Sequence, residues 1–157
     1  MKSTTHTPLV IAFIGVVALF VLFGGEEKGL QGSTYFAGRM PGSFSKVAAM
    51  FNFDMEGEGD KAGAAISAVP ETLKTAILLA DEKSRTLAGT WAMTPPGVRG
   101  SDFAPFFNQG IPCASFWSNG PHIEYHTRGD TIYRINPDIL ADIARLAFRA
   151  AMLFANL

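Results

Sequence analysis

Three apolar stretches of the chain predict buried strands. They cover about residues 16–23, the segment "KVAAMFNFDMEG" at residues 46–57, and the segment "IPCASFWS" at residues 111–118. Short continuous apolar runs of this kind are typical of strands that are covered on both faces. The second run closes on Asp54, so the pattern predicts an acid at the carboxyl end of a strand.

The first stretch belongs to a longer apolar run from Leu9 to Phe23, which has fifteen consecutive uncharged residues. Such a run after a single early lysine resembles a signal peptide or a short membrane anchor. It is shorter than the ~20 residues that span a bilayer, and it lacks a clear small-x-small cleavage site. We therefore leave residues 1–15 open between a targeting remnant and an extra strand, and with them a secreted or membrane-associated location.

Two segments carry apolar residues at helical spacing. Pro70 is expected to begin a helix that runs to about Ser84. A long closing helix follows Asn136, the candidate N-cap, and Pro137 in its first turn. Its predicted apolar stripe consists of Ile139, Leu140, Ile143, Ala147, Ala150 and Phe154.

Strands interleaved with helices define the expected fold class. Buried strands of this type imply a mainly parallel sheet with helices on both faces, an α/β fold of three layers, α/β/α. The chain has 157 residues, enough for one domain with a substantial core and too few for two ordinary ones. We therefore expect residues 1–157 to form a single domain.

Composition excludes some classes of protein. Thirteen Lys and Arg against fourteen Asp and Glu give a formal net charge of −1, without the basic excess of a nucleic-acid-binding protein. Cys113 is the only cysteine, which excludes an intrachain disulfide and a thiolate zinc cluster. Its expected role is that of a small buried apolar residue.

Two adjacent acids, Glu26 and Glu27, follow the first apolar run and Gly24-Gly25. If a strand ends there and turns into a helix, both carboxylates lie at the carboxyl edge of the sheet, where open α/β folds build their sites. The alternative is a solvated first helical turn, because acids favour the positive end of a helix dipole.

Residues 119–131, "NGPHIEYHTRGDT", contain two of the three histidines of the chain. These are His122 and His126, and Asp130 follows the latter by four residues. A metal-binding imidazole usually donates its second N–H to a carboxylate or carbonyl, and Asp130 could serve His126 in this way. Either histidine could instead be an exposed loop residue.

Four segments follow one another along the chain and precede a long helix: "GGEEKGLQGSTYF", "FNFDMEG", "GSDFAPFFNQGIP" and "YHTRGDT". In this order they resemble the zinc-dependent exopeptidases typified by bacterial leucyl aminopeptidase and aminopeptidase Y. The resemblance covers about residues 18–157. Four ordered motifs are far more specific than any one of them. The resemblance implies a two-zinc aminopeptidase that removes residues from peptides with a free N-terminus.

The resemblance also implies roles for individual residues. Glu26 would be the general base, Glu27 and His126 would bind one zinc, and Asp54 would bind the other. Asp102 and Asp130 would support this centre from outside the ligand shell. A general base that is not itself a ligand can take a proton from water and return it to the leaving amine.

The chain departs from this family at three places. The complete family has a histidine ligand and a bridging aspartate upstream of the Glu-Glu pair, whereas this chain has no aspartate before Asp54. The only upstream histidine, His6, lies too far along the chain to be a good candidate. Phe103 occupies a position where the family usually has a histidine. Only three ligands remain for two ions, although one catalytic zinc normally takes three protein ligands.

We therefore expect the C-terminal part of an aminopeptidase domain that holds at most one zinc and is weakly active or inactive alone. A partner chain or a missing N-terminal segment would complete the site. Two alternatives stay open: a non-catalytic binding or receptor-like module of the same fold, and a glutaminyl cyclase-like acyltransferase with a single zinc. Zinc content distinguishes the first alternative, and a cyclisation assay beside an aminopeptidase assay distinguishes the second.

Overall fold

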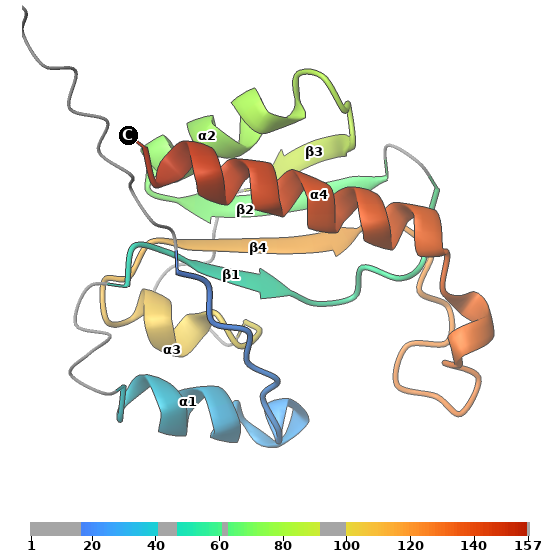
Figure 1. The fold of residues 1–157 in the computed structure, drawn as a ribbon. Helices are drawn as coiled ribbons and strands as arrows, with labels where there is room; N and C mark the ends of the chain where they lie inside the picture. The colour runs from blue at the N-terminus through green and yellow to red at the C-terminus, as the bar shows by residue number, and fades with distance from the viewer. Residues whose placement is uncertain (1–16, 41–46, 61–62, 92–99, 157) are drawn as a thin grey trace, which may run out of the picture.

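A computed structural model describes residues 17–40, 47–60, 63–91 and 100–156 (Figure 1). The early positions His6 and Leu9 lie outside the described residues. In chain order, the elements are η1 (Glu26–Lys28), α1 (Gln31–Ala37), β1 (Met50–Phe53), β2 (Ala64–Val69), α2 (Glu71–Asp81), β3 (Leu87–Trp91), α3 (Ala104–Phe107), β4 (Cys113–Ser118), η3 (Ile132–Arg134) and α4 (Pro137–Phe154).

The four strands form one mixed sheet in the order β1-β4-β2-β3. β1 lies parallel to β4, with Phe53 opposite Phe116. β2 lies parallel to β3 and antiparallel to β4. Because β1 and β4 run in the same direction, the loops that follow them begin at the same edge of the sheet, at Asp54 and Asn119 (Figure 1).

One face of the sheet is covered by α2 and α4, which pack against each other (Figure 1). We call it the α2/α4 face. Its side chains form the larger hydrophobic core, because both helices present an apolar stripe to the buried side of β2 and β4. The largest of these side chains are Ile66, Leu73, Ile77, Phe116, Ile139, Ile143 and Leu146.

The opposite face carries α1 and α3 (Figure 1), and we call it the α1/α3 face. Its core is smaller and is built around Phe103, Phe106 and Cys113. The partly buried rings of Phe23 and Phe36 join it, with ring centroids 5.8 Å apart. Helices on both faces of the sheet confirm the expected three-layer α/β fold, although the sheet is mixed because β2 and β4 are antiparallel.

The closing helix begins as the sequence predicts. The side chain of Asn136 accepts a hydrogen bond of 3.0 Å from the backbone N–H of Asp138, and Pro137 is the first helical residue. The predicted stripe is wrong at Leu140, which is 41% exposed, and it omitted Leu146, which is fully buried. Among the described helices, none combines the length and the apolar character needed to cross a bilayer.

The strand predicted for residues 16–23 is wrong over its described part. Residues 17–23 form no strand, and Val17, Phe20 and Leu22 are 89%, 91% and 102% exposed. A strand needs a neighbour for its backbone hydrogen bonds, and residues 17–23 pair with none of the four described strands. Phe23 is the end of this segment that packs, through its ring on the α1/α3 face.

Other element boundaries also differ from the prediction. β2 lies in a segment for which the pattern predicted no strand, and its alanines are small enough to lie buried between the two helical layers. β1 is an edge strand whose Phe53 is 47% exposed, so it is not covered on both faces. α2 ends at Asp81 rather than Ser84, because the Asp81 carboxylate accepts the backbone N–H of Thr86 at 2.6 Å and turns the chain.

Candidate metal centre

The Glu26–Glu27 pair is held on a tight turn at the start of η1. Gly25 and Gly29 flank the turn with φ values of 73° and 96°, a left-handed conformation that glycine adopts without steric cost. The backbone N–H of Gly32 donates to the carbonyl of Gly24 at 2.9 Å and closes the turn. The two carboxylates therefore stand on a short, backbone-fixed turn that leads into α1.

Glu27 meets His126 across 99 residues of sequence. Its Oε1 lies 2.5 Å from Nε2 of His126, and both side chains are more than half exposed. His126 has a φ of 60°, which is uncommon for a residue with a side chain. Its ring stacks on that of Tyr125 with centroids 3.7 Å apart. The loop after β4 thus delivers an imidazole to the turn that carries the two acids.

Electrostatic coupling identifies the other groups near this contact. Burial raises the pKa of Glu26, and the negative charges of Glu27, Asp54 and Asp102 raise it further, while His126 lowers it. These groups come from the turn at η1, the end of β1, the segment before α3 and the loop after β4. Four separate segments therefore contribute ionisable groups to one region at this edge of the sheet.

The phenol of Tyr125 interacts with carboxylates of the same region. Burial raises the pKa of its phenol, and so do the carboxylates of Glu27, Asp54 and Glu26. Asp54 itself directly follows β1, where its backbone N–H donates to the carbonyl of Phe116 at 3.2 Å. The strand pairing thus fixes the backbone from which the Asp54 side chain extends.

Asp102 and Phe103 lie next to each other but in different surroundings. One carboxylate oxygen of Asp102, Oδ1, is buried and has no hydrogen-bond partner among the described residues. Phe103 is 6% exposed and packs in the core of the α1/α3 face. The phenyl ring that stands where the family usually has a histidine therefore serves packing, and it offers Asp102 no donor.

The other predicted residues of the second motif lie slightly apart. Asp130 borders a cavity beside Tyr125, and in the described part of the chain no hydrogen bond joins its carboxylate to His126. His122 is turned inward: its Nε2 lies 2.9 Å from the carbonyl of Ser118, so this nitrogen carries the proton and donates it.

The donor set suits part of a metal site. Glu27 and His126 are an oxygen and a nitrogen donor already in contact, which is the chemistry that a catalytic zinc uses. Within the described residues, however, no three histidine, cysteine, aspartate or glutamate side chains come together as a complete metal-binding group. Open α/β folds bind their ligands at the carboxyl edge of the sheet, and carboxylates with an imidazole are donor types that a catalytic zinc takes.

Comparison with known proteins identifies the family of the chain. The sequence profile of peptidase family M28 matches residues 16–151. The chain therefore belongs to peptidase family M28, which confirms the family that its motifs resemble. The comparison with curated proteins found no match.

Three solved structures show the same fold. The LapA aminopeptidase of Legionella pneumophila has 20% sequence identity and a TM-score of 0.71, and the match covers 85% of this chain and 38% of that one. The aminopeptidase of Aneurinibacillus sp. strain AM-1 has 26% identity and a TM-score of 0.65, and the match covers 85% of this chain and 32% of that one. The zinc aminopeptidase BSAP of Bacillus subtilis has 27% identity and a TM-score of 0.64, and the match covers 83% of this chain and 33% of that one. The chain thus spans 32–38% of the length of these three structures.

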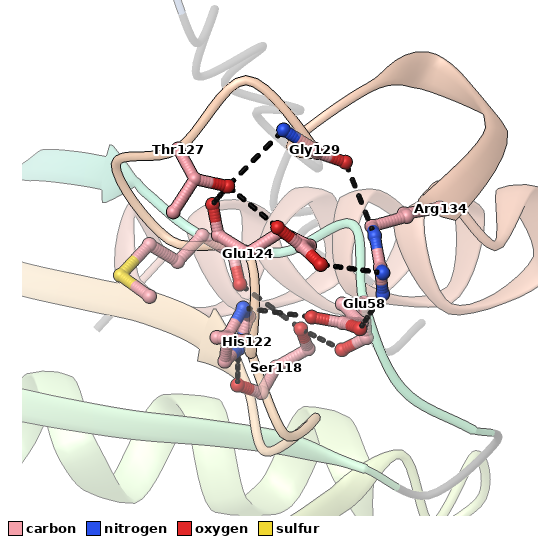
Figure 2. A network of polar contacts seen from close by, with 8 residues as sticks. Glu58, Ser118, His122, Glu124, Thr127, Gly129 and Arg134 are labelled. Atoms are coloured by element: carbon pink, nitrogen blue, oxygen red, sulfur yellow. Dashed lines mark hydrogen bonds and ion pairs between the residues drawn. The ribbon is translucent and has the colours of Figure 1, made fainter.

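Sequence reasoning missed a polar network next to the centre (Figure 2). Arg134 contacts Glu58 and Glu124 at 3.4 and 3.2 Å, and Nδ1 of His122 lies 3.6 Å from Glu58. Ser118 adds a hydroxyl donated to the carbonyls of Met55 and Glu58. The sequence signals that pointed to it were the acid-rich run "DMEGEGD" at residues 54–60 and His122.

Proposed function

We propose that this chain is part of a zinc-dependent aminopeptidase-type hydrolase that removes N-terminal residues from peptides. The observation that carries the proposal is the 2.5 Å contact between Glu27 and His126, in a chain of family M28. The zinc aminopeptidase BSAP, at 27% identity, supports the choice of metal and of peptide substrate. The role of each residue is our assignment.

Glu27 and His126 would hold one zinc, and Asp54 is the donor for a second position. When bound, zinc lowers the pKa of a water and polarises the scissile carbonyl. Glu26, which stands beside these ligands without being one, would take the proton from that water and give it to the leaving amine. Burial and the neighbouring carboxylates raise the pKa of Glu26, and a raised pKa makes a carboxylate a stronger base.

The ligand set is too small for two ions. We expect at most one zinc per chain, held weakly by Glu27, His126 and water, and little or no turnover from this chain alone. A second dication would be repelled by the first without a bridging acid between them. We propose that a partner chain or a further N-terminal segment supplies the missing donors, which agrees with the limited share of the solved aminopeptidases that this chain covers.

Two variants test the assignment by separating a ligand from a base. In Glu26→Gln the zinc content should hardly change, because the general base does not bind metal. In His126→Ala zinc binding should be abolished, because only Glu27 remains beside solvent. Metal analysis of the purified chain gives the stoichiometry, and hydrolysis of an aminoacyl anilide in added zinc gives the activity.

Other outcomes would contradict this proposal in different ways. Two tightly bound zinc ions, or robust turnover abolished by Glu26→Gln, would overturn the incomplete site. Complete absence of zinc binding would favour a non-catalytic binding module of the same fold. That second function has one observation in its favour, which is that no three ligating side chains cluster within the described residues.

A further inference from the structure

A cavity of about 230 Å³ lies directly beside the candidate centre. Met55 and Tyr125 form part of its wall, and they are the sequence neighbours of Asp54 and His126. A peptide held at the centre could therefore extend a side chain into it. Most of the remaining wall is ionisable and consists of Glu56, Glu58, Glu124, Asp130, His122 and Arg134.

The positive charge in this wall is already paired. Arg134 contacts Glu58 and Glu124 from one guanidinium group, as Figure 2 shows. His122 donates to a backbone carbonyl, with Glu58 at its other ring nitrogen. Four carboxylates thus face one arginine and one histidine in the cavity wall. Even with Glu56 counted as neutral, the three other carboxylates outnumber the two cationic groups, so the cavity carries an excess of negative charge.

Glu56 is the carboxylate that most lacks a partner. Its Oε1 is buried and accepts no hydrogen bond from any described residue. An unpaired buried carboxylate is costly, because it has lost water without gaining a donor or a counter-charge. Because Glu56 lines the cavity, a cation there would provide a counter-charge to its carboxylate. Without such a cation, burial and the charge of Asp54 raise the pKa of Glu56 to about 7.

The size and lining of the cavity indicate the kind of cation. Its volume of about 230 Å³ corresponds to roughly seven waters at ~30 Å³ each, enough for a long side chain. Met55, Tyr125 and Ile135 offer apolar surface to an aliphatic stem. A metal ion fits less well, because no three ligating side chains cluster among the described residues and Arg134 stands in the wall.

We propose that this cavity receives the side chain of an N-terminal lysine or arginine of the peptide and that Glu56 balances its charge. The inference rests on the proposed function, since it takes the neighbouring centre to hold the peptide's amino end. It assigns Glu56 as a residue that determines specificity, and it names peptides with a basic first residue as the substrate class.

The test measures binding of lysinamide and norleucinamide to the zinc-loaded chain by calorimetry. Both ligands carry the same amino end, and they differ in the charge at the tip of the side chain. We expect lysinamide to bind about tenfold more tightly, with the preference falling to less than about twofold in Glu56→Gln. The matched control is Glu82→Gln, which removes the same charge from an exposed position at the end of α2 and should keep the preference.

A second measurement does not depend on the variants. Nuclear Overhauser contacts between the lysinamide side chain and the Tyr125 ring should be observed in the wild-type chain, because Tyr125 lines the cavity. Their absence while lysinamide is bound would overturn the proposal. An equal loss of preference in Glu56→Gln and Glu82→Gln would also overturn it, since net charge would then explain the effect.

Zinc stoichiometry, measured in parallel, separates this proposal from the function on which it rests. Zinc bound through His126 with equal affinities for the two amides would overturn the cavity assignment and leave the proposed function intact. A lysinamide preference that Glu56→Gln removes, in a chain that binds no zinc, would support the cavity as a cation site and contradict the peptidase assignment.

Discussion

The two faces of the sheet are packed by different kinds of side chain. On the α2/α4 face, five aliphatic side chains of the helices are at most 1% exposed: Leu73, Ile77, Ile139, Ile143 and Leu146. On the α1/α3 face, the helices are 7 and 4 residues long, and the core combines phenylalanine rings with smaller side chains, most of its members being only partly buried. The first face buries long apolar stripes, and the second buries a small cluster.

The candidate centre belongs to the less densely buried side. Glu26 and Glu27 precede α1, and Asp102 precedes α3. Short helices with few buried contacts unfold locally at a low cost in free energy. Segments that bind ligands often have such a low local stability. We infer that the α2/α4 face supplies most of the stability of the fold and that the α1/α3 face positions the acids.

The largest effect is expected from Leu146→Ala on the α2/α4 face. Leu146 is fully buried, so its truncation should lower the free energy of unfolding by ~2–5 kcal/mol through lost transfer energy and a residual cavity. Leu140→Ala is the matched control, since Leu140 is on the same helix and 41% exposed. Denaturant unfolding measures both variants. An equal loss of unfolding free energy in both variants would contradict the contrast between the two faces, because burial on the α2/α4 face would not then determine stability.

The next effect concerns Phe23, which connects the residues before η1 to the α1/α3 face. Its ring centroid lies 5.9 Å from that of Phe106 and 5.8 Å from that of Phe36. We expect Phe23→Ala to lower the free energy of unfolding by ~1–2 kcal/mol, as for a half-buried aromatic side chain. It should also weaken zinc binding about tenfold, because the turn that carries Glu27 would lose its anchor.

Phe154→Ala provides the control on the opposite face. Phe154 is a partly buried aromatic residue that packs on the α2/α4 core at the end of α4. It should show a similar loss of stability with an unchanged zinc affinity. Unfolding curves and competition with a zinc chelator give the two quantities. A zinc affinity lowered equally by both variants would show that global stability, rather than the α1/α3 face, determines metal binding.

The same contrast explains how much of the fold could be predicted. α4 was predicted almost to its ends, because Asn136 and Pro137 mark its start and its apolar spacing persists over five turns. The strand prediction for the apolar run at residues 17–23 was wrong, because composition indicates a tendency to be buried and not the presence of a neighbouring strand. β2 was missed for the opposite reason, since small residues such as Ala64 and Ala65 resemble a loop until two layers enclose them.

The candidate site could be predicted only through ordered motifs. Glu27 and His126 are 99 residues apart, so no local pattern relates them, and their pairing followed from the family resemblance. Their roles as ligands stay predictions. The cavity was not predicted, because the contact of Arg134 with Glu58 joins residues 76 positions apart and depends on the loops after β1 and β4.

The smallest effect that we predict is a pH dependence from Cys113, the fully buried thiol of the α1/α3 face. Burial raises its pKa from 9.0 to about 12. Between these values the unfolded chain releases the thiol proton and the folded chain keeps it, so stability falls as the pH rises above about 9. At about pH 10 this loss should be ~1 kcal/mol relative to pH 8.

Cys113→Ala isolates this effect, because lysines and tyrosines titrate in the same range and contribute equally to both chains. From about pH 9 upward the unfolding free energy of the wild type should fall more steeply with pH than that of the variant, and below that pH the two curves should run parallel. Curves that stay parallel up to pH 10 would mean that the folded thiol titrates near its ordinary value. Water would then reach the α1/α3 core in the folded state, and the difference between the two faces would be larger than the burial of Cys113 indicates.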